Sequence, residues 1–192
     1  MQRENGVVIG VVADLDDPER LGRVRVKLPH LADQVSDWSR QATPMGGRER
    51  GLFFRPEIGD EVLVACEQGD PRRTIVVGAL WSKVDPPPPD DGNTTDNNWR
   101  FFRSRSGHLL KFDDTSGSER IEIVGSGGDH KLVIDVSGRK IEISCSSGDV
   151  SISAPTGKVE IEASQVAIKA QASLSIEAGG ALTVKGATVA IN

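Results

Sequence analysis

The C-terminal half of this 192-residue chain repeats one short pattern, in which apolar residues occupy alternate positions and a turn follows. The units begin every 7–11 residues from Leu110 onward, and no aromatic residue follows Phe112. Apolar residues at alternate positions lie on one face of a β-strand. Short strands that recur in this way are typical of stacked β architectures. The pattern therefore predicts a succession of short strands, each with one face to bury.

These strands need an apolar partner surface, and one chain has too little bulk to supply it. Several units place two β-branched residues before a small one, as in Val150, Ile152 and Ala154. This form suits a narrow axis on which equivalent strands from several chains converge. We therefore expect a homotrimeric, intertwined β-helix or β-prism needle with polar residues such as Glu160, Glu162 and Lys169 outside. The expected trimer-axis core comprises Ile121, Ile123, Leu132, Ile134, Ile141, Ile143, Val150, Ile152, Val159, Ile161, Val166, Ile168, Leu174, Ile176, Leu182 and Val184.

The N-terminal part has longer apolar runs and more varied loops. Five or six strands within about 75 residues are typical of a small barrel. No segment shows a sustained helical period, so the whole chain is expected to be β. The expected barrel strands are residues 7–13, 23–28, 38–42, 52–55, 61–67 and 74–80. The expected domains are a small barrel (residues 1–82), a linker rich in proline and aspartate (83–99) and the repetitive needle (100–192).

Composition excludes several classes of protein. The formal net charge is -5, whereas a nucleic-acid carrier is usually basic. Cys66 and Cys145 lie in different halves and form neither a disulfide framework nor a metal-ligand pair. No apolar run approaches the roughly 18 residues that span a bilayer, and the N-terminus is polar. We expect no secretory signal, no transmembrane segment and assembly in the cytoplasm.

Several residues that could act in catalysis or bind a ligand have simpler structural interpretations. Asp113 and Asp114 precede Thr115-Ser116-Gly117, where aspartate commonly caps a turn, so we do not expect a catalytic pair. His108 and His130 share the parity of the apolar residues and could meet their copies on a trimer axis, but we favour bonds to nearby backbone. Cys145 occupies a position that alanine fills elsewhere, which indicates packing. The sequence predicts no catalytic residue, no metal site and no cofactor.

Two other functions remain open at this stage. Arg20, Arg23, Arg25 and Lys27 make the second strand of the barrel basic, and OB-folds often bind single strands there. An oligomeric nucleic-acid binder is therefore one alternative. A carbohydrate-binding β-helix of the tailspike type is the other, although its sites display exposed aromatic residues that this repeat lacks.

Several ordered motifs of the barrel carry a family resemblance. They are Leu21-Gly-Arg-Val-Arg-Val-Lys-Leu-Pro, Ala42-Thr-Pro-Met-Gly-Gly, Arg50-Gly-Leu-Phe-Phe-Arg-Pro-Glu-Ile-Gly-Asp-Glu-Val-Leu-Val and Gly69-Asp-Pro-Arg-Arg. Together with residues 104–115 they resemble the spike proteins of contractile injection systems, which include phage baseplate assembly protein V and the VgrG spikes.

The resemblance implies a central spike in which three OB domains form a collar and three C-terminal segments form a needle. Such a spike sits at the tip of a tube and pierces a target membrane when the sheath contracts. The barrel begins near residue 5, so we expect a separate baseplate hub protein, with residues 14–20 and 48–50 as candidate contact loops. A needle that ends on Val189 and Ile191 would expose apolar strand edges, which predicts a tip protein of the proline-alanine-alanine-arginine (PAAR) type.

Overall fold

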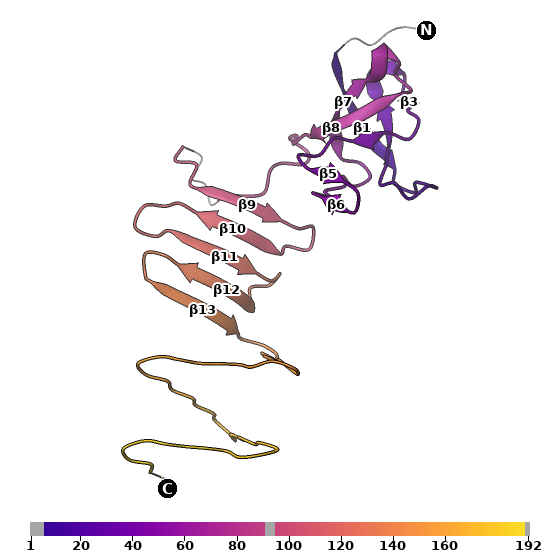
Figure 1. Ribbon diagram of the computed structural model, residues 1–192. Coiled ribbons are helices and arrows are strands. Elements are labelled where there is room, and N and C mark those ends of the chain that lie inside the picture. Colours follow the sequence, from indigo (N-terminus) through magenta and orange to yellow (C-terminus); the bar gives the residue numbers. More distant parts are fainter. Residues whose placement is uncertain (1–5, 91–94, 191–192) are drawn as a thin grey trace.

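The computed structural model describes residues 6–90 and 95–190 of the chain. Within these residues the structure is all-β, apart from the 3₁₀ turns η1 (Pro29–Leu31) and η2 (Glu67–Gly69). A barrel-like N-terminal domain is followed by a sheet of stacked strands and then by an extended C-terminal segment (Figure 1). The predicted all-β class is confirmed.

The N-terminal strands form one sheet that closes on itself. Strand β1 (Val7–Asp14) lies between β2 (Arg25–Leu28) and β7 (Glu61–Cys66), and β7 pairs with β8 (Thr74–Ala79). Strand β4 (Arg40–Gln41) runs parallel to β8, and the short β3 (Gln34–Val35) extends the other edge. Val24 and Ser39 exchange backbone hydrogen bonds of 3.0 and 2.8 Å, which joins the two edges. The domain is therefore an OB-like barrel, as the sequence predicts.

The barrel core consists of alternate residues from these strands. Its members are almost fully buried: Val12, Val24, Val26, Leu28, Val62, Val64 and Val76. Buried hydroxyl groups cross the same interior where β2, β4 and β8 meet. Ser36 Oγ lies 3.1 Å from Ser39 Oγ, which is also hydrogen-bonded to Thr74 Oγ1. Each hydroxyl has a partner, so these polar groups can be buried without a large desolvation penalty.

The strand predicted at residues 52–55 is wrong. A small hairpin of β5 (Gly46–Gly47) and β6 (Arg50–Gly51) lies just before it, and residues 52–55 are extended without joining a ladder. The apolar residues of this segment are exposed, so the run of leucine and phenylalanine is not a barrel strand. Pro56, which has no N–H to donate, ends the segment.

The second sheet is a simple antiparallel meander. Its order is β9 (Trp99–Arg103), β10 (Leu109–Asp113), β11 (Arg120–Val124), β12 (His130–Asp135) and β13 (Lys140–Cys145). Each strand pairs with the next one along the chain. The first four repeat units of the sequence thus form strands β10 to β13. Strand β9, which starts inside the predicted linker, was not predicted.

No strand is assigned among the described residues after β13. Residues 146–190 run as an extended chain in Figure 1, and the later strands that the pattern predicts, from Val150 to Val189, do not form here. A strand requires hydrogen-bonding partners, and this single chain supplies none to them. The β-helix needle therefore stays a prediction. Ile191, predicted to contact a tip protein, lies outside the described residues.

Candidate assembly surfaces

The register of the meander places the predicted inward residues on one face. Phe102, Leu110, Ile123, Leu132 and Ile143 are successive cross-strand partners from β9 to β13. A second row of partners on the same face consists of Phe112, Ile121, Ile134 and Ile141. Directly opposed residues of an antiparallel pair point to the same side, so the two rows make one continuous apolar face.

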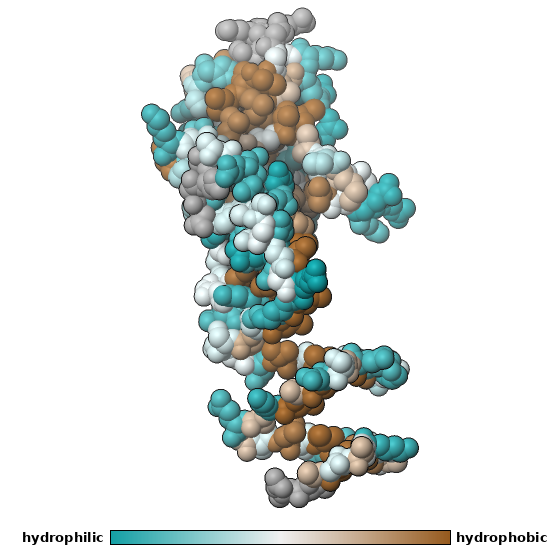
Figure 2. Space-filling model, turned by 90° about the vertical axis from the view of Figure 1, so that its left-hand side faces the viewer, coloured by the Kyte–Doolittle hydropathy of each residue, from teal (hydrophilic) through white to brown (hydrophobic). Residues whose placement is uncertain are grey.

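This apolar face is only partly covered in the single chain, because Leu110, Ile121, Leu132 and Ile134 are half-buried and its other members are exposed. Phe112 is 43% exposed, and the exposure reaches 70% at Ile141 on the last strand. Hydrophobic residues also follow one another down the lower part of the molecule, along the sheet and the extended segment (Figure 2). Apolar patches of this extent on a protein surface mark interaction sites.

The extended segment repeats the same feature. Every member of the predicted axis core between residues 150 and 184 is more than half exposed, and so is Val189. The members are Val150, Ile152, Val159, Ile161, Val166, Ile168, Leu174, Ile176, Leu182 and Val184. Each has a branched aliphatic side chain, and more than half of its surface is exposed to water. The segment thus requires a partner to bury them.

The opposite face of the meander holds a compact charged cluster. Lys111 Nζ lies 2.7 Å from a carboxylate oxygen of Glu122, and its ammonium group lies 3.9 Å from the centre of the Trp99 ring. The side chains of Lys111 and Asp113 are only 7% and 3% exposed. Arg120 Nε approaches the carboxylates of both Asp113 and Glu122, at 3.6 and 3.5 Å. The side chains thus point to the faces that the alternation predicts. On β10, however, the buried residues are the polar ones, Lys111 and Asp113.

Asp113 caps a turn, as predicted, and also belongs to this cluster. Its carboxylate accepts hydrogen bonds from the backbone N–H and the hydroxyl of Thr115 at 3.1 and 2.6 Å. Burial raises the pKa of Asp113, but the bonds from Thr115 and the charge of Lys111 outweigh it and hold that pKa below its ordinary value. Asp114 instead pairs with Arg100 at 2.7 Å. The two neighbouring carboxylates are therefore structural and separately neutralised.

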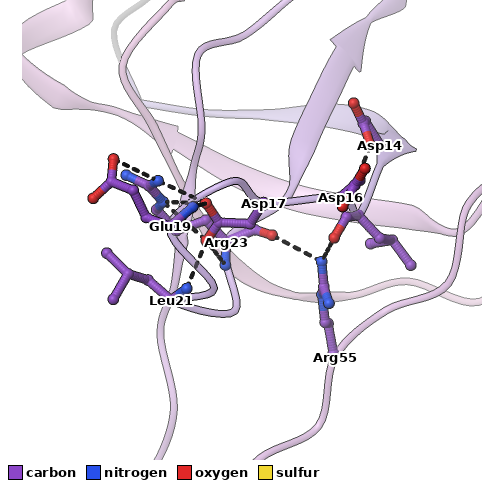
Figure 3. Close-up of polar contacts among 8 residues, drawn as sticks. Asp14, Asp16, Asp17, Glu19, Leu21, Arg23 and Arg55 are labelled. Atoms are coloured by element: carbon purple, nitrogen blue, oxygen red, sulfur yellow. Dashed lines mark hydrogen bonds and ion pairs between the residues drawn. The ribbon is translucent and has the colours of Figure 1, made fainter.

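A second polar cluster fixes the loop between β1 and β2, as Figure 3 shows. The carboxylate of Asp17, whose side chain is 2% exposed, accepts bonds from the backbone N–H groups of Glu19, Leu21 and Arg23. Arg23 Nη2 lies 2.6 Å from the same carboxylate. Hydrogen bonding from the Arg23 guanidinium is the main reason that the pKa of Asp17 lies well below its ordinary value.

Arg55 ties this loop to the segment that follows the β5–β6 hairpin. Its Nη2 donates to the backbone carbonyl of Leu15 and, at 3.1 Å, to that of Arg23 (Figure 3). Neither charged cluster was predicted from the sequence. The only signal was the presence of Asp17 and Arg23 on either side of one loop, which does not distinguish a buried pair from two surface charges.

A groove of about 900 Å³ runs along the outside of the barrel beside β4. Its lining includes the aromatic residues Trp38 and Phe53 and the basic residues Arg40, Arg72 and Arg73. Phe53 lies against Gly22, where a Cβ atom would be 2.9 Å from its ring. The groove therefore presents aromatic and guanidinium groups side by side.

The basic strand of the barrel is engaged internally. Arg23 pairs with Asp17, Arg25 donates to the Ser36 carbonyl at 3.1 Å, and Lys27 Nζ lies 3.9 Å from the Asp33 carboxylate. The guanidinium of Arg25 also lies 5.9 Å from the centre of the Trp38 ring. These contacts engage the positive charges that would have to bind the phosphates of a nucleic acid. The arrangement of this strand therefore does not favour a nucleic-acid-binding site.

The remaining candidate residues have local partners. The Nδ1 atom of His108 accepts a hydrogen bond of 3.0 Å from the backbone N–H of Ser126, which confirms the predicted backbone contact. His130 is paired with Cys145 across β12 and β13, and the Cys145 thiol donates to the Ser147 carbonyl at 3.1 Å. In the part of the chain that the structure describes, no group of histidine, cysteine and carboxylate side chains could hold a metal ion. The same residues include no helix long and apolar enough to cross a membrane.

Two contacts join the barrel directly to the meander. The rings of Phe54 and Phe102 are stacked, with centroids 5.2 Å apart and an angle of 9° between their planes. Arg105, in the turn after β9, lies 3.2 Å from the Glu57 carboxylate. Because Phe102 is the first member of one apolar row, that row reaches the exposed aromatic segment of the barrel.

The barrel matches a known family of domains. Residues 8–81 match the type VI secretion system/phage-baseplate injector OB domain. This match agrees with the closed sheet and its parallel β4–β8 pair. The N-terminal part of the chain is therefore similar to the injector OB domains.

Curated relatives extend the similarity beyond the barrel. The chain is 30% identical over 127 residues to the type VI secretion system spike protein VgrG5 of Pseudomonas aeruginosa, which covers 62% of this chain and 16% of that protein. It is 25% identical over 141 residues to VgrG1a of the same organism, covering 68% and 22% of the two proteins. VgrG3 of Vibrio cholerae is 28% identical over 111 residues, or 54% of this chain and 11% of that protein.

These matches confirm the predicted resemblance to the central spike proteins of contractile injection systems. The chain is VgrG-like in its barrel and in part of the sheet that follows. It spans about a fifth or less of the length of these relatives.

Proposed function

We propose that this chain is the structural central spike of a contractile injection machine and acts as a homotrimer at the tip of the inner tube. In this role the three OB domains form a collar, and the residues after it wind into a needle that pierces the target membrane on sheath contraction. The proposed role is mechanical and needs no catalytic residue, metal or cofactor.

The observation that carries the proposal is the partly exposed apolar face. One of its two rows crosses all five strands of the meander, the other crosses β10 to β13, and the same alternation continues to Val189. Burial of apolar surface contributes roughly 25 cal/mol per Å², so a face of this size strongly favours association. Strands of equivalent chains would also supply the inter-strand hydrogen bonds that pair residues 146–190 into a sheet. Three copies that meet on one axis satisfy both requirements at once.

Two partners belong to the proposed machine. A baseplate hub protein would contact the OB domain, for which the loops at residues 14–20 and 48–50 are candidates. A PAAR-type tip protein would cover the C-terminal end, where Val189 is exposed. The chain would be incorporated into a particle assembled in the cytoplasm. The similarity to type VI spike proteins supports this placement.

The solution mass of the purified chain tests the proposal most directly. Light scattering should give about three times 20.6 kDa, and small-angle scattering should show an elongated particle. An intertwined trimer must unfold in order to dissociate, so its dissociation should be slow and the trimer should persist on dilution. A monomer that is folded throughout would overturn the proposal.

A further inference from the structure

The groove beside β4 has a chemistry suited to one particular kind of segment. Its guanidinium groups point outward: the side chains of Arg40, Arg72 and Arg73 are 70%, 55% and 63% exposed. Their carboxylate partners, Glu67 and Asp70, are each only 25% exposed. A ligand that approaches the groove therefore meets three exposed guanidinium groups and one exposed carboxylate, that of Asp37, next to the exposed ring of Phe53 and the half-buried ring of Trp38.

The linker of this chain has the complementary chemistry. Asp85 is followed by four consecutive prolines, Pro86 to Pro89, and most of this run is exposed. Consecutive prolines favour the extended polyproline II conformation, which docks into aromatic-lined grooves at a low cost in conformational entropy. The hydroxyl of Ser82 accepts bonds from the backbone N–H groups of Val84 and Asp85, which fixes a turn just before the prolines.

The linker cannot easily occupy the groove of its own barrel. None of the described linker residues lines that groove. The two ends of the linker are also fixed, since β8 precedes it and the Phe54–Phe102 and Glu57–Arg105 contacts hold the following strand against the barrel. In Figure 1 the described residues of the linker that follow β8 lead away from the barrel. A second copy of the chain is therefore the occupant that the geometry favours.

We propose that the proline-rich linker of one chain binds in the barrel groove of a second copy. The prolines pack against Phe53 and Trp38, and Asp85 faces the arginine side of the groove. This inference rests on the proposed trimer, because it requires neighbouring copies of the OB domain. It assigns to the linker a role in holding adjacent collar domains together.

Disulfide trapping in the full chain tests this contact. Cys66→Ala and Cys145→Ala first remove the native thiols, and Ala42→Cys then places a thiol in the groove while Pro87→Cys places one on the linker. Ala42 lines the groove and is exposed. We expect mild oxidation to join the chains covalently, visible as dimer and trimer bands without reductant. Val35→Cys with Pro87→Cys is the matched control, because Val35 is exposed on β3 and lies outside the groove.

A charge reversal provides a second measurement. Arg72→Glu and Asp85→Arg should each lower the yield of the cross-link, by up to about fivefold, which is the upper limit for a contact between exposed charges, and the double variant should restore it. A trimer whose cross-linking is no stronger than in the control, or a cross-link within one chain, would overturn this inference and leave the spike intact. A protein that forms no trimer at all would overturn both.

Discussion

Lys111 is buried between an anion and an aromatic ring: its Nζ atom lies 2.7 Å from the Glu122 carboxylate and 3.9 Å from the centre of the Trp99 ring. Trp99 belongs to β9, Lys111 to β10 and Glu122 to β11, so one ammonium group connects the first three strands of the meander. A buried charge of this kind is stabilising only while its partners remain. The cluster therefore holds together the start of the proposed needle.

Removal of the Lys111 charge should destabilise this sheet. Lys111→Gln leaves the Asp113 and Glu122 carboxylates with only the partly exposed Arg120 as a cationic partner, and we expect a loss of about 2–3 kcal/mol. Thermal unfolding followed by circular dichroism measures the effect. Lys140→Gln is the matched control, because Lys140 pairs with Glu142 on the surface of the same sheet and should leave the Tm unchanged. Equal effects of the two substitutions would contradict a structural role for the cluster.

A charge on the predicted axis should prevent assembly. Ile161→Lys would bury three unpaired ammonium groups at one level of a homotrimer, which costs far more than the interface can supply there. Light scattering and electrophoresis at room temperature in detergent should show loss of the trimer. Glu162→Lys, one position further along, reverses a charge on the outer face and should leave the trimer intact. An unaffected trimer in both variants would refute the assigned parity.

Acid should weaken the barrel through Asp17. Its pKa is lowered in the folded state, mainly by the Arg23 side chain, so its contribution to stability is complete above the ordinary pKa of about 3.9 and is lost as the pH falls through the folded value. We expect the Tm to fall as the pH is lowered below about 4. In Asp17→Asn the Tm should be lower at neutral pH and should depend less on pH in this range. Asp16→Asn is the control, since Asp16 is exposed and only its backbone N–H bonds within the loop.

Gly22 should not tolerate a side chain. Its φ of +73° lies in the left-handed region, and an added Cβ would be 2.9 Å from the Phe53 ring that borders the groove. Gly22→Ala should therefore cost about 1–2 kcal/mol, measured by denaturant unfolding. Gly78→Ala provides the comparison, because that position in β8 has open space around it, and its stability should change little. A neutral result at Gly22 would mean that neither the left-handed backbone at this position nor the place of the Phe53 ring is fixed.

The C-terminal end should bind the tip protein through its apolar residues. Truncation after Gly186 removes Val189, and we expect loss of co-purification with a candidate PAAR-type protein. A full-length Val189→Lys variant should weaken binding, whereas Thr188→Lys, on the alternate parity, should not. Undiminished binding by the truncated chain would place the tip contact elsewhere.

The alternation of apolar residues predicted strands β10 to β13 and the face that they share. Residues at every second position of a strand, such as Ile121 and Ile123, lie on the same face. The barrel strands were predicted for the same reason. The run of Leu52 to Phe54 was misinterpreted, since its apolar residues line a surface groove instead of the core. The buried charges of Lys111 and Asp17 could not be predicted, because charged residues are interpreted as exposed until their partners from other strands are known. Strand β9 has aromatic and basic residues without regular alternation, and only its pairing with β10 reveals it.

The antiparallel meander also sets how the molecule gains length. In Figure 1 its strands lie across the long axis and are stacked along it, and neighbouring strands in a sheet are about 4.8 Å apart. The four spacings between β9 and β13 therefore account for about 19 Å. One additional hairpin adds two spacings, or about 10 Å, and leaves the cross-section as it was. The length and the thickness of this architecture are thus independent. Duplication or deletion of repeats in the gene changes the length alone.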